Sequence, residues 1–184
     1  EVQELKRKSG DPEELVGSSL LVSQLRQMVD KVGPTNSRVM IFGPSGSGKE
    51  VVARLMHKKS LRAEGPFVAL NAAAITPENM ETELFGVEAG GGRTRKTGAL
   101  ERAHRGTLYL DEIGEMPLET QKKILRVLID QQFERVGGSR RVTVDVRILS
   151  STALDLRARI DDGLFRQDLF HRLAVVPVRI PALS

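Results

Sequence analysis

One stretch of this chain constrains its fold more than any other. Residues 43–49 read GPSGSGK and lie between a short apolar segment and an amphipathic one. Glycines let successive backbone amides turn inward around a bulky anion, because no side chain blocks the approach. A helix beginning near Lys49 adds the partial positive charge of its N-terminus, and the lysine ammonium supplies a point charge. A strand, a glycine loop, a lysine and a helix in this order predict a phosphate-binding loop, with Lys49 at its surface.

The segments around this loop alternate between short apolar runs and runs of helical periodicity. Apolar side chains recur at helical spacing over 21–32, and Gly33-Pro34 ends that helix. Further helices are expected from about 49 to 59, over 77–85 and from about 117, and strands over 38–42, 67–70, 107–110, 147–150 and 174–178. This alternation predicts an α/β fold with a parallel five-stranded sheet and helices on both faces.

Two segments break the alternation. Residues 133–146 contain Gly137-Gly138 followed by alternating valines, which is typical of a β-hairpin. Residues 86–98 are rich in glycine, arginine and lysine and have little apolar content, so a loop or mobile segment is expected there.

The composition excludes several classes of site. The 184 residues contain no cysteine, which rules out disulfides, thiolate zinc sites and iron–sulfur clusters, and the three histidines are too scattered for a metal site. No apolar run reaches the roughly 20 residues of a membrane span, and the N-terminus lacks the apolar core of a secretory signal. A cytoplasmic protein without a membrane partner is the expectation. The net charge of +4 alone would suit a nucleic-acid-binding domain, but aromatic residues, which stack on bases, make up only 4%.

A second pattern, TLYLDE at residues 107–112, places two acids at the end of an apolar strand. If that strand ends beside the phosphate loop, Asp111 would lie close to a magnesium ion and Glu112 could polarise an attacking water. The residue after Lys49 is Glu50, where phosphate loops usually carry the serine or threonine whose hydroxyl holds magnesium. Magnesium coordination would therefore depend on other groups, with Asp111 as the metal ligand.

Together these blocks resemble the central AAA+ ATPase domain of bacterial enhancer-binding proteins, the activators of sigma-54 RNA polymerase. The resemblance extends from about Leu15 to Leu183 and rests on blocks in the family's order: GPSGSGKEVVARLMH, PFVALNAAAI, ELFG, GTLYLDEIGEMP, QKKILRVL, FERVGG, VDVRIL and FRQDLFHRL. It implies an AAA+ P-loop NTPase core that binds ATP or ADP with Mg²⁺. The nucleotide-binding residues would be Val16, Gly17, Gly43, Pro44, Ser45, Gly46, Ser47, Gly48, Lys49, Glu50 and Val51, of which the first two flank the adenine.

The resemblance also implies catalytic roles for residues outside the loop, beside those of Lys49, Asp111 and Glu112. Asn71 matches a residue that pairs with the family's catalytic glutamate and senses the γ-phosphate, although an asparagine after a strand can equally cap a turn. Arg166 and Arg172 match arginine fingers that reach a neighbour's nucleotide, although a surface helix carries such arginines routinely. Fingers of this kind imply self-association into a ring or a dimer.

The chain departs from the family pattern in three places. The GAFTGA signature of the sigma-54-contacting loop is replaced by VEAGGGRTRKTGALE, and the sensor strand ends in Ser150-Ser151-Thr152-Ala153 without the usual asparagine. The printed sequence also ends where the family's helical lid begins, so the lid is expected to be absent. The first two departures resemble NtrX-type nitrogen response regulators, which carry a receiver domain before this one and a Fis-like DNA-binding domain after it.

On this resemblance, residues 1–11 form a linker tail and residues 12–184 form a nucleotide-binding subdomain. The function it implies is ATP binding and hydrolysis within a DNA-binding two-component response regulator that controls transcription, with DNA and RNA polymerase contacted by the longer protein. The alternative is a nucleotide-binding oligomerisation module with little or no hydrolysis and no sigma-54 remodelling. The missing sensor asparagine and the missing lid favour that alternative.

Overall fold

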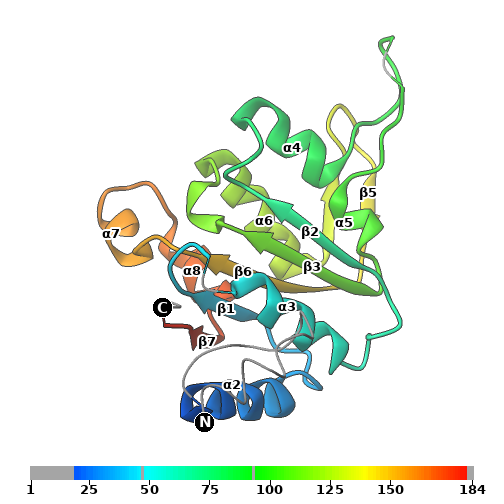
Figure 1. The fold of residues 1–184 in the computed structure, drawn as a ribbon. Helices are drawn as coiled ribbons and strands as arrows, with labels where there is room; N and C mark the ends of the chain where they lie inside the picture. Colours follow the sequence, from blue (N-terminus) through cyan, green and yellow to red (C-terminus); the bar gives the residue numbers. More distant parts are fainter. Residues whose placement is uncertain (1–18, 47, 93, 182–184) are drawn as a thin grey trace.

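Five parallel strands form the central sheet, in the order β2-β3-β6-β1-β7 (Figure 1). The structure is a computed structural model that describes residues 19–46, 48–92 and 94–181. The strands are β1 (Val39–Phe42), β2 (Phe67–Asn71), β3 (Gly106–Asp111), β6 (Val146–Thr152) and β7 (Val176–Arg179). The predicted parallel five-stranded sheet is therefore confirmed, and its boundaries shift by only one or two residues at most ends.

Helices cover both faces of the sheet, because successive strand residues point to opposite sides. On one face, Val39, Ile41, Tyr109 and Leu149 pack with α2 (Ser19–Val32) and α3 (Lys49–Lys58), and Figure 1 shows these two helices below the sheet. On the other face, Met40, Leu108, Leu110 and Ile148 pack in a larger core. That core includes side chains of α4 (Pro77–Phe85), α5 (Ala99–Arg102), α6 (Leu118–Asp130) and α8 (Gln167–Leu173).

Two shorter elements and a small hairpin complete the described part of the chain. A 3₁₀ turn, η1 (Ile113–Glu115), follows β3, and α7 (Leu156–Asp161) follows β6. The strands β4 (Gln132–Glu134) and β5 (Arg141–Thr143) pair antiparallel, with Phe133 opposite Val142, which confirms the predicted hairpin. Within the described residues, no helix is both long and apolar enough to cross a membrane.

The segment over residues 86–98, called the arm here, projects from the fold between α4 and α5 (Figure 1). Its stem is held by backbone pairing of Val87 with Lys96 and with Val136, and its exposed tip contains Gly90, Gly91 and Gly92. Gly86 enters the stem at φ 79°, and a Cβ there would lie 2.4 Å from the Lys96 carbonyl oxygen. The arm is thus a loop, as predicted, but its stem is fixed by hydrogen bonds.

A buried arginine joins the sheet to the helix that precedes it. Arg147, in β6, is only 1% exposed, yet its guanidinium donates to the carbonyls of Ser37 (2.9 Å), Gly33 (2.8 Å) and Val32 (3.2 Å). Burial lowers its pKa to about 10, so the group is still charged at neutral pH. These bonds satisfy carbonyls at the end of α2 and in the loop that leads to β1.

Replacing Arg147 with methionine keeps an unbranched apolar stem but removes the donors to three backbone carbonyls. Each hydrogen bond to a charged group contributes about 1.5–3 kcal/mol, so we expect Arg147→Met to lower the free energy of unfolding by about 3 kcal/mol or more. Urea unfolding followed by circular dichroism measures the change. The matched control is Arg141→Met, at an exposed arginine, for which a change within about 0.5 kcal/mol is expected. Equal stability of the two variants would contradict this role for Arg147.

Candidate functional site

The polar ends of three neighbouring strands meet at one edge of the sheet. Asp111 ends β3, Thr152 ends β6, and Gly43 follows β1 directly. The backbone amide of Gly43 donates to the Thr152 carbonyl at 3.2 Å, so the glycine loop leaves the sheet directly beside the end of β6. Because the carboxyl ends of parallel strands lie on one side, the two sequence patterns that predicted phosphate chemistry come together here.

The backbone of the glycine loop adopts a left-handed conformation at two of its glycines. Gly46 and Gly48 have φ angles of 77° and 89°, a left-handed region that side chains with a Cβ rarely adopt. Helix α3 begins at Lys49, immediately after Gly48. Pro44, Ser45 and Gly46 are exposed. Ser47 lies outside the described residues, as do Val16 and Gly17 and the proposed linker at 1–11.

Lys49 is buried, with 6% of its surface exposed, and is not at the loop surface as the sequence led us to expect. Its ammonium donates to the carbonyl oxygens of Gly43 (2.8 Å) and Pro44 (3.0 Å) and lies 3.8 Å from Glu112 Oε2. A buried charge requires such partners. The side chain therefore folds back under its own loop, where two of its three donors are used by the carbonyls.

Glu112 adopts a left-handed backbone conformation, with φ 55° and ψ 51°, which is uncommon for a residue other than glycine. Its Oε1 accepts a hydrogen bond from the backbone amide of Ala153 (3.2 Å), just beyond the end of β6. The carboxylate thus lies between the Lys49 ammonium and the end of β6. Sequence reasoning found Glu112 but had no signal for this strained turn or for the amide that engages the side chain.

Asp111 accepts a hydrogen bond from one hydroxyl group, which is in turn held by a second. The sequence analysis found neither of these two groups. Ser151 Oγ donates to Asp111 Oδ1 at 2.6 Å, and the Tyr109 hydroxyl donates to Ser151 Oγ at 2.8 Å. Tyr109 and Ser151 are completely buried, and burial raises the pKa of the Tyr109 phenol, which keeps its proton in place. The available signal was the presence of hydroxyl-bearing residues on two buried strands.

Three other predicted residues lie in or next to these elements, and the two polar ones have partners of their own. Asn71 ends β2 opposite Asp111 in the strand pairing, and its Oδ1 accepts from the Ala73 amide at 2.8 Å, so the side chain caps a turn. Glu50 is exposed and pairs with Arg54 at 2.9 Å. Val51 is half-buried in the first turn of α3.

Arg166 and Arg172 flank α8, at its start and near its end. The Arg166 guanidinium donates twice to Asp168, at 3.0 and 2.9 Å, and this pairing raises the pKa of the arginine. The backbone amide of Arg166 donates to the buried Gln121, which attaches the start of α8 to α6. Arg172 is exposed.

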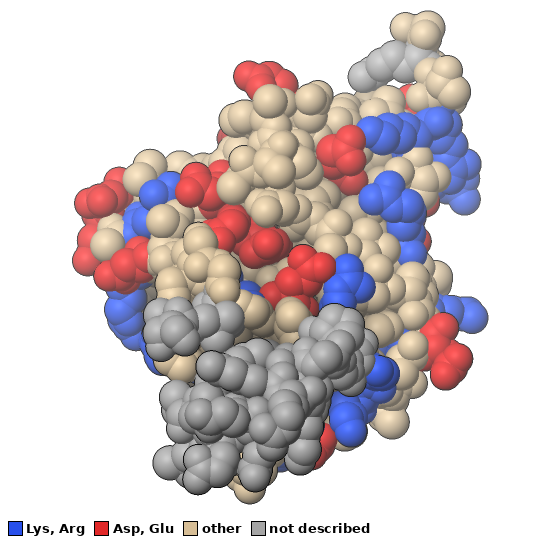
Figure 2. Space-filling view, in the orientation of Figure 1, with Lys and Arg blue, Asp and Glu red and all other residues tan. Residues whose placement is uncertain are grey.

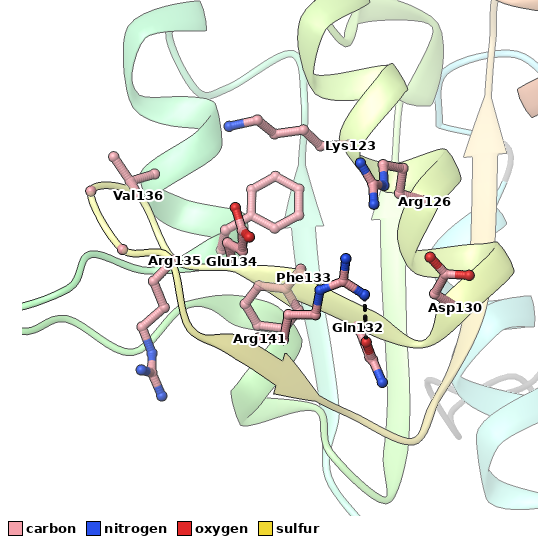
Figure 3. Close-up of a pocket in the computed structure, with 12 residues that line it drawn as sticks. Lys123, Arg126, Asp130, Gln132, Phe133, Glu134, Arg135, Val136 and Arg141 are labelled. Atoms are coloured by element: carbon pink, nitrogen blue, oxygen red, sulfur yellow. Dashed lines mark hydrogen bonds between the residues drawn. The ribbon is translucent and has the colours of Figure 1, made fainter.

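Two cavities differ in their relation to these residues. One, of about 700 Å³, begins at Gly43 and Pro44 and extends along the end of β6, α7 and β7, so it is lined in part by the glycine loop. The other, of about 380 Å³, lies between α6 and the β4–β5 hairpin (Figure 3). Figure 3 shows Arg141 bonded to Gln132 across its floor, while Arg135 points away from it. None of the predicted site residues lines this second cavity.

Charges are unevenly distributed over the face seen in Figure 2. Acidic side chains lie across its middle, and basic side chains gather along its right side, at the base of the arm. Two cations of the arm are paired with carboxylates: Lys96 with Glu83 at 2.7 Å, and Arg95 with Glu101 at 3.8 Å. The positive charge of the arm is thus partly neutralised by the protein itself.

Known proteins resemble this chain over most of its length. NtrX from Azorhizobium caulinodans is 60% identical over 184 residues, which are 100% of this chain and 40% of that protein. The transcriptional regulator NtrC from Escherichia coli K12 is 46% identical over 178 residues, 95% of this chain and 38% of that protein. The chain therefore spans about 40% of the length of these relatives.

Solved structures support the same fold. A crystal structure of NtrX from Brucella abortus in complex with ATP superimposes with a TM-score of 0.88 and 64% identity, covering 98% of this chain and 40% of that one. The P-loop NTPase domain of a sigma-54 activator from Escherichia coli shares the fold at a TM-score of 0.63 and 20% identity, covering 92% of this chain and 100% of that one.

The similarity to these structures is consistent with the parallel sheet and with the position of the glycine loop beside its polar edge. The family described as the sigma-54 interaction domain matches residues 15–179. That match covers most of the chain, and it includes the glycine loop, both acids at the end of β3 and the arginines that flank α8. The chain therefore belongs to the sigma-54 interaction domain family, whose fold is that of the AAA+ P-loop NTPases.

Proposed function

We propose that this chain binds ATP and ADP at the loop of residues 43–50 and hydrolyses ATP, as the central domain of a DNA-binding response regulator that controls transcription. The observation that carries the proposal is the convergence of Lys49, Asp111 and Glu112 beside the glycine loop. Lys49 Nζ lies 3.8 Å from Glu112 Oε2, and Asp111 precedes Glu112 at the end of β3. Relatives support it, since NtrX from Brucella abortus has been crystallised with ATP and with ADP.

The residues at this edge fit a magnesium–nucleotide complex. Among the described residues, no group of three or more histidines, aspartates and glutamates could hold a metal ion unaided. Magnesium commonly binds through one or two carboxylates together with phosphates and water, which matches a single Asp111 beside the loop. When bound, magnesium would neutralise charge on the phosphate oxygens. Lys49 has one donor left for a phosphate oxygen after its two carbonyl bonds.

In hydrolysis, Glu112 would orient and polarise the attacking water, and Asn71 would respond to the γ-phosphate through its amide. Arg166 and Arg172 would act on the nucleotide of a neighbouring copy, so turnover would depend on self-association. In the single chain Arg166 is bound to Asp168 at 2.9 Å, so reaching a neighbour requires this ion pair to open. Receiver and Fis-like DNA-binding domains, and contacts with DNA and RNA polymerase, belong to the longer regulator in this proposal.

A second candidate is a nucleotide-binding oligomerisation module with little hydrolysis. One observation favours it: Glu112 Oε1 is engaged by the Ala153 amide at 3.2 Å, at the position where the family's sensor asparagine is missing. A carboxylate held in this way is less free to accept a proton from water. The glycine tip of the arm, which takes the place of the GAFTGA signature, similarly favours a regulator that does not remodel sigma-54 polymerase.

The first test removes the charge at the loop. Lys49→Ala should weaken ATP binding about 10- to 100-fold, because a charge-assisted hydrogen bond contributes about 1.5–3 kcal/mol. Calorimetry with ATP and Mg²⁺ measures the affinity, and a thermal unfolding curve checks the fold. Lys59→Ala is the control, since Lys59 is exposed and pairs with Asp30 on the surface. An affinity for ATP equal to that of the parent would show that the loop is not the nucleotide site.

The two acids should have separable roles. Glu112→Gln should bind ATP normally and lose about 10²- to 10⁴-fold in turnover, because an amide cannot accept a proton from water. Asp111→Ala should instead weaken the magnesium dependence of binding. Phosphate release and calorimetry at several Mg²⁺ concentrations distinguish the two outcomes. An equal loss of binding in both variants would argue against distinct roles.

A mixing experiment tests whether Arg166 acts on a neighbour. Arginine fingers contribute about 10³- to 10⁵-fold to turnover in nucleotide hydrolases. In the full-length regulator, Arg166→Ala and Lys49→Ala should each be slow, and a mixture should recover activity by combining one intact loop with one intact finger. Arg141→Ala, an exposed arginine beside the other cavity, should remain at the parent rate. No recovery at concentrations where the parent assembles would assign Arg166 a structural role.

A further inference from the structure

The edge of the sheet contains a chain of two buried hydroxyls that ends on Asp111. We propose that Tyr109 and Ser151 are positioning residues that hold the Asp111 carboxylate where it can bind Mg²⁺, an inference that rests on the proposed nucleotide site. The Tyr109 hydroxyl lies 2.8 Å from Ser151 Oγ, which lies 2.6 Å from Asp111 Oδ1. These three side chains are called the relay here.

The chemistry of the groups fixes the direction of each hydrogen bond. An ionised carboxylate only accepts, so Ser151 must give its one proton to Asp111. Ser151 Oγ then has only acceptor capacity left, which the Tyr109 hydroxyl meets as the donor. Tyr109 and Ser151 are 0% exposed, so water cannot replace either bond. The Ser151 hydroxyl therefore keeps an acceptor for its proton only while the carboxylate stays in place.

Packing anchors the far end of the relay in the core. The Tyr109 ring stacks on Phe67 of β2, with centroids 6.1 Å apart, and Phe67 also contacts His57 of α3. His57 is itself fixed, through ring nitrogens 2.8 Å from Thr107 Oγ1 and 3.1 Å from the Gly65 carbonyl. The phenol oxygen thus has little freedom, and this rigidity reaches Asp111 through one serine.

Because the residue after Lys49 offers no hydroxyl, binding of a metal would depend more strongly on how Asp111 is held. In most phosphate loops a serine or threonine at that position supplies a hydroxyl beside the metal. Here that position is Glu50, whose carboxylate is exposed and pairs with Arg54 at 2.9 Å. Ser151 instead supplies a hydroxyl to Asp111 from β6, the strand that lies between β3 and β1. It engages Oδ1, and the carboxylate keeps acceptor capacity with which it would meet the cation or its water shell.

A merely structural role would leave the metal dependence of binding unchanged, and this difference defines the experiment. ATP affinity is measured by calorimetry in EDTA and across a Mg²⁺ titration for the parent, Tyr109→Phe, Ser151→Ala and the double variant. The double variant is essential, because Ser151→Ala alone leaves the buried Tyr109 hydroxyl without its acceptor. Replacing both groups removes the relay without leaving a buried Tyr109 hydroxyl unpaired, and thermal unfolding should report a more stable fold than in Ser151→Ala.

We expect metal-free affinity to stay within about twofold of the parent in all variants. The Mg²⁺ concentration for half-maximal effect should rise about tenfold or more in Ser151→Ala and in the double variant, because groups that orient a metal ligand commonly contribute 10- to 100-fold. Tyr109→Phe should show a smaller rise, since Ser151 can still donate to Asp111. Ser151→Thr keeps a hydroxyl at this position, so its half-maximal Mg²⁺ concentration should lie between those of the parent and Ser151→Ala.

Two results would overturn the relay while leaving the nucleotide site intact. One is an unchanged half-maximal Mg²⁺ concentration in the double variant. The other is an equal fall in affinity with and without Mg²⁺, which would indicate a structural role only. Asp111→Asn separates these from failure of the proposed function. If Asp111→Asn retains the parent's Mg²⁺ dependence, or if the parent binds no ATP, the assignment of the site itself is wrong and the relay falls with it.

Discussion

The central strands β3, β6 and β1 run parallel and are covered by helices on both faces, which restricts where polar side chains can lie. Along β3, Leu108, Tyr109 and Leu110 are fully buried, and the ionisable acid appears only at the last residue of the strand. Charged groups are therefore displaced to the carboxyl edge, where the loop after β1 also begins. The candidate site lies at this edge because helices cover both faces of the sheet, so charged side chains reach solvent mainly at the strand ends.

Where charge does enter the interior, the protein surrounds it with acceptors. Lys49 meets the carbonyls of Gly43 and Pro44, and Arg147 meets three carbonyls near the end of α2. Arg135 is 8% exposed and lies between Glu101 and Glu88. Its own pKa is raised, mainly by the hydrogen bond with Glu101. Arg147 and Arg135 join segments that are distant in sequence, so they stabilise an arrangement of elements, whereas the carbonyl bonds of Lys49 hold its own loop.

Arg135 also connects the β4–β5 hairpin to the arm and to α5. It belongs to the connection after β4, Glu88 lies in the stem of the arm, and Glu101 lies in α5. The backbone pairing of Val87 with Val136 runs alongside these ion pairs. The arm is consequently fixed at its stem by the hairpin, while its glycine tip has no Cβ to restrict it.

From the sequence alone one can predict the parallel sheet, the glycine loop and the acids at the end of β3. Those features depend on local pattern: glycine spacing sets the loop conformation, and apolar runs that end in acids mark strand ends. Which side chains meet at the site depends instead on how the strands are arranged in space. Ser151 reaches Asp111 from 40 residues away, and Ala153 reaches Glu112 from 41, contacts set by strand order and not by neighbouring residues. The burial of Lys49 and the pairing of Arg166 with Asp168 likewise depend on side-chain packing, because sequence pattern gives the position of a charge but not the partner it selects.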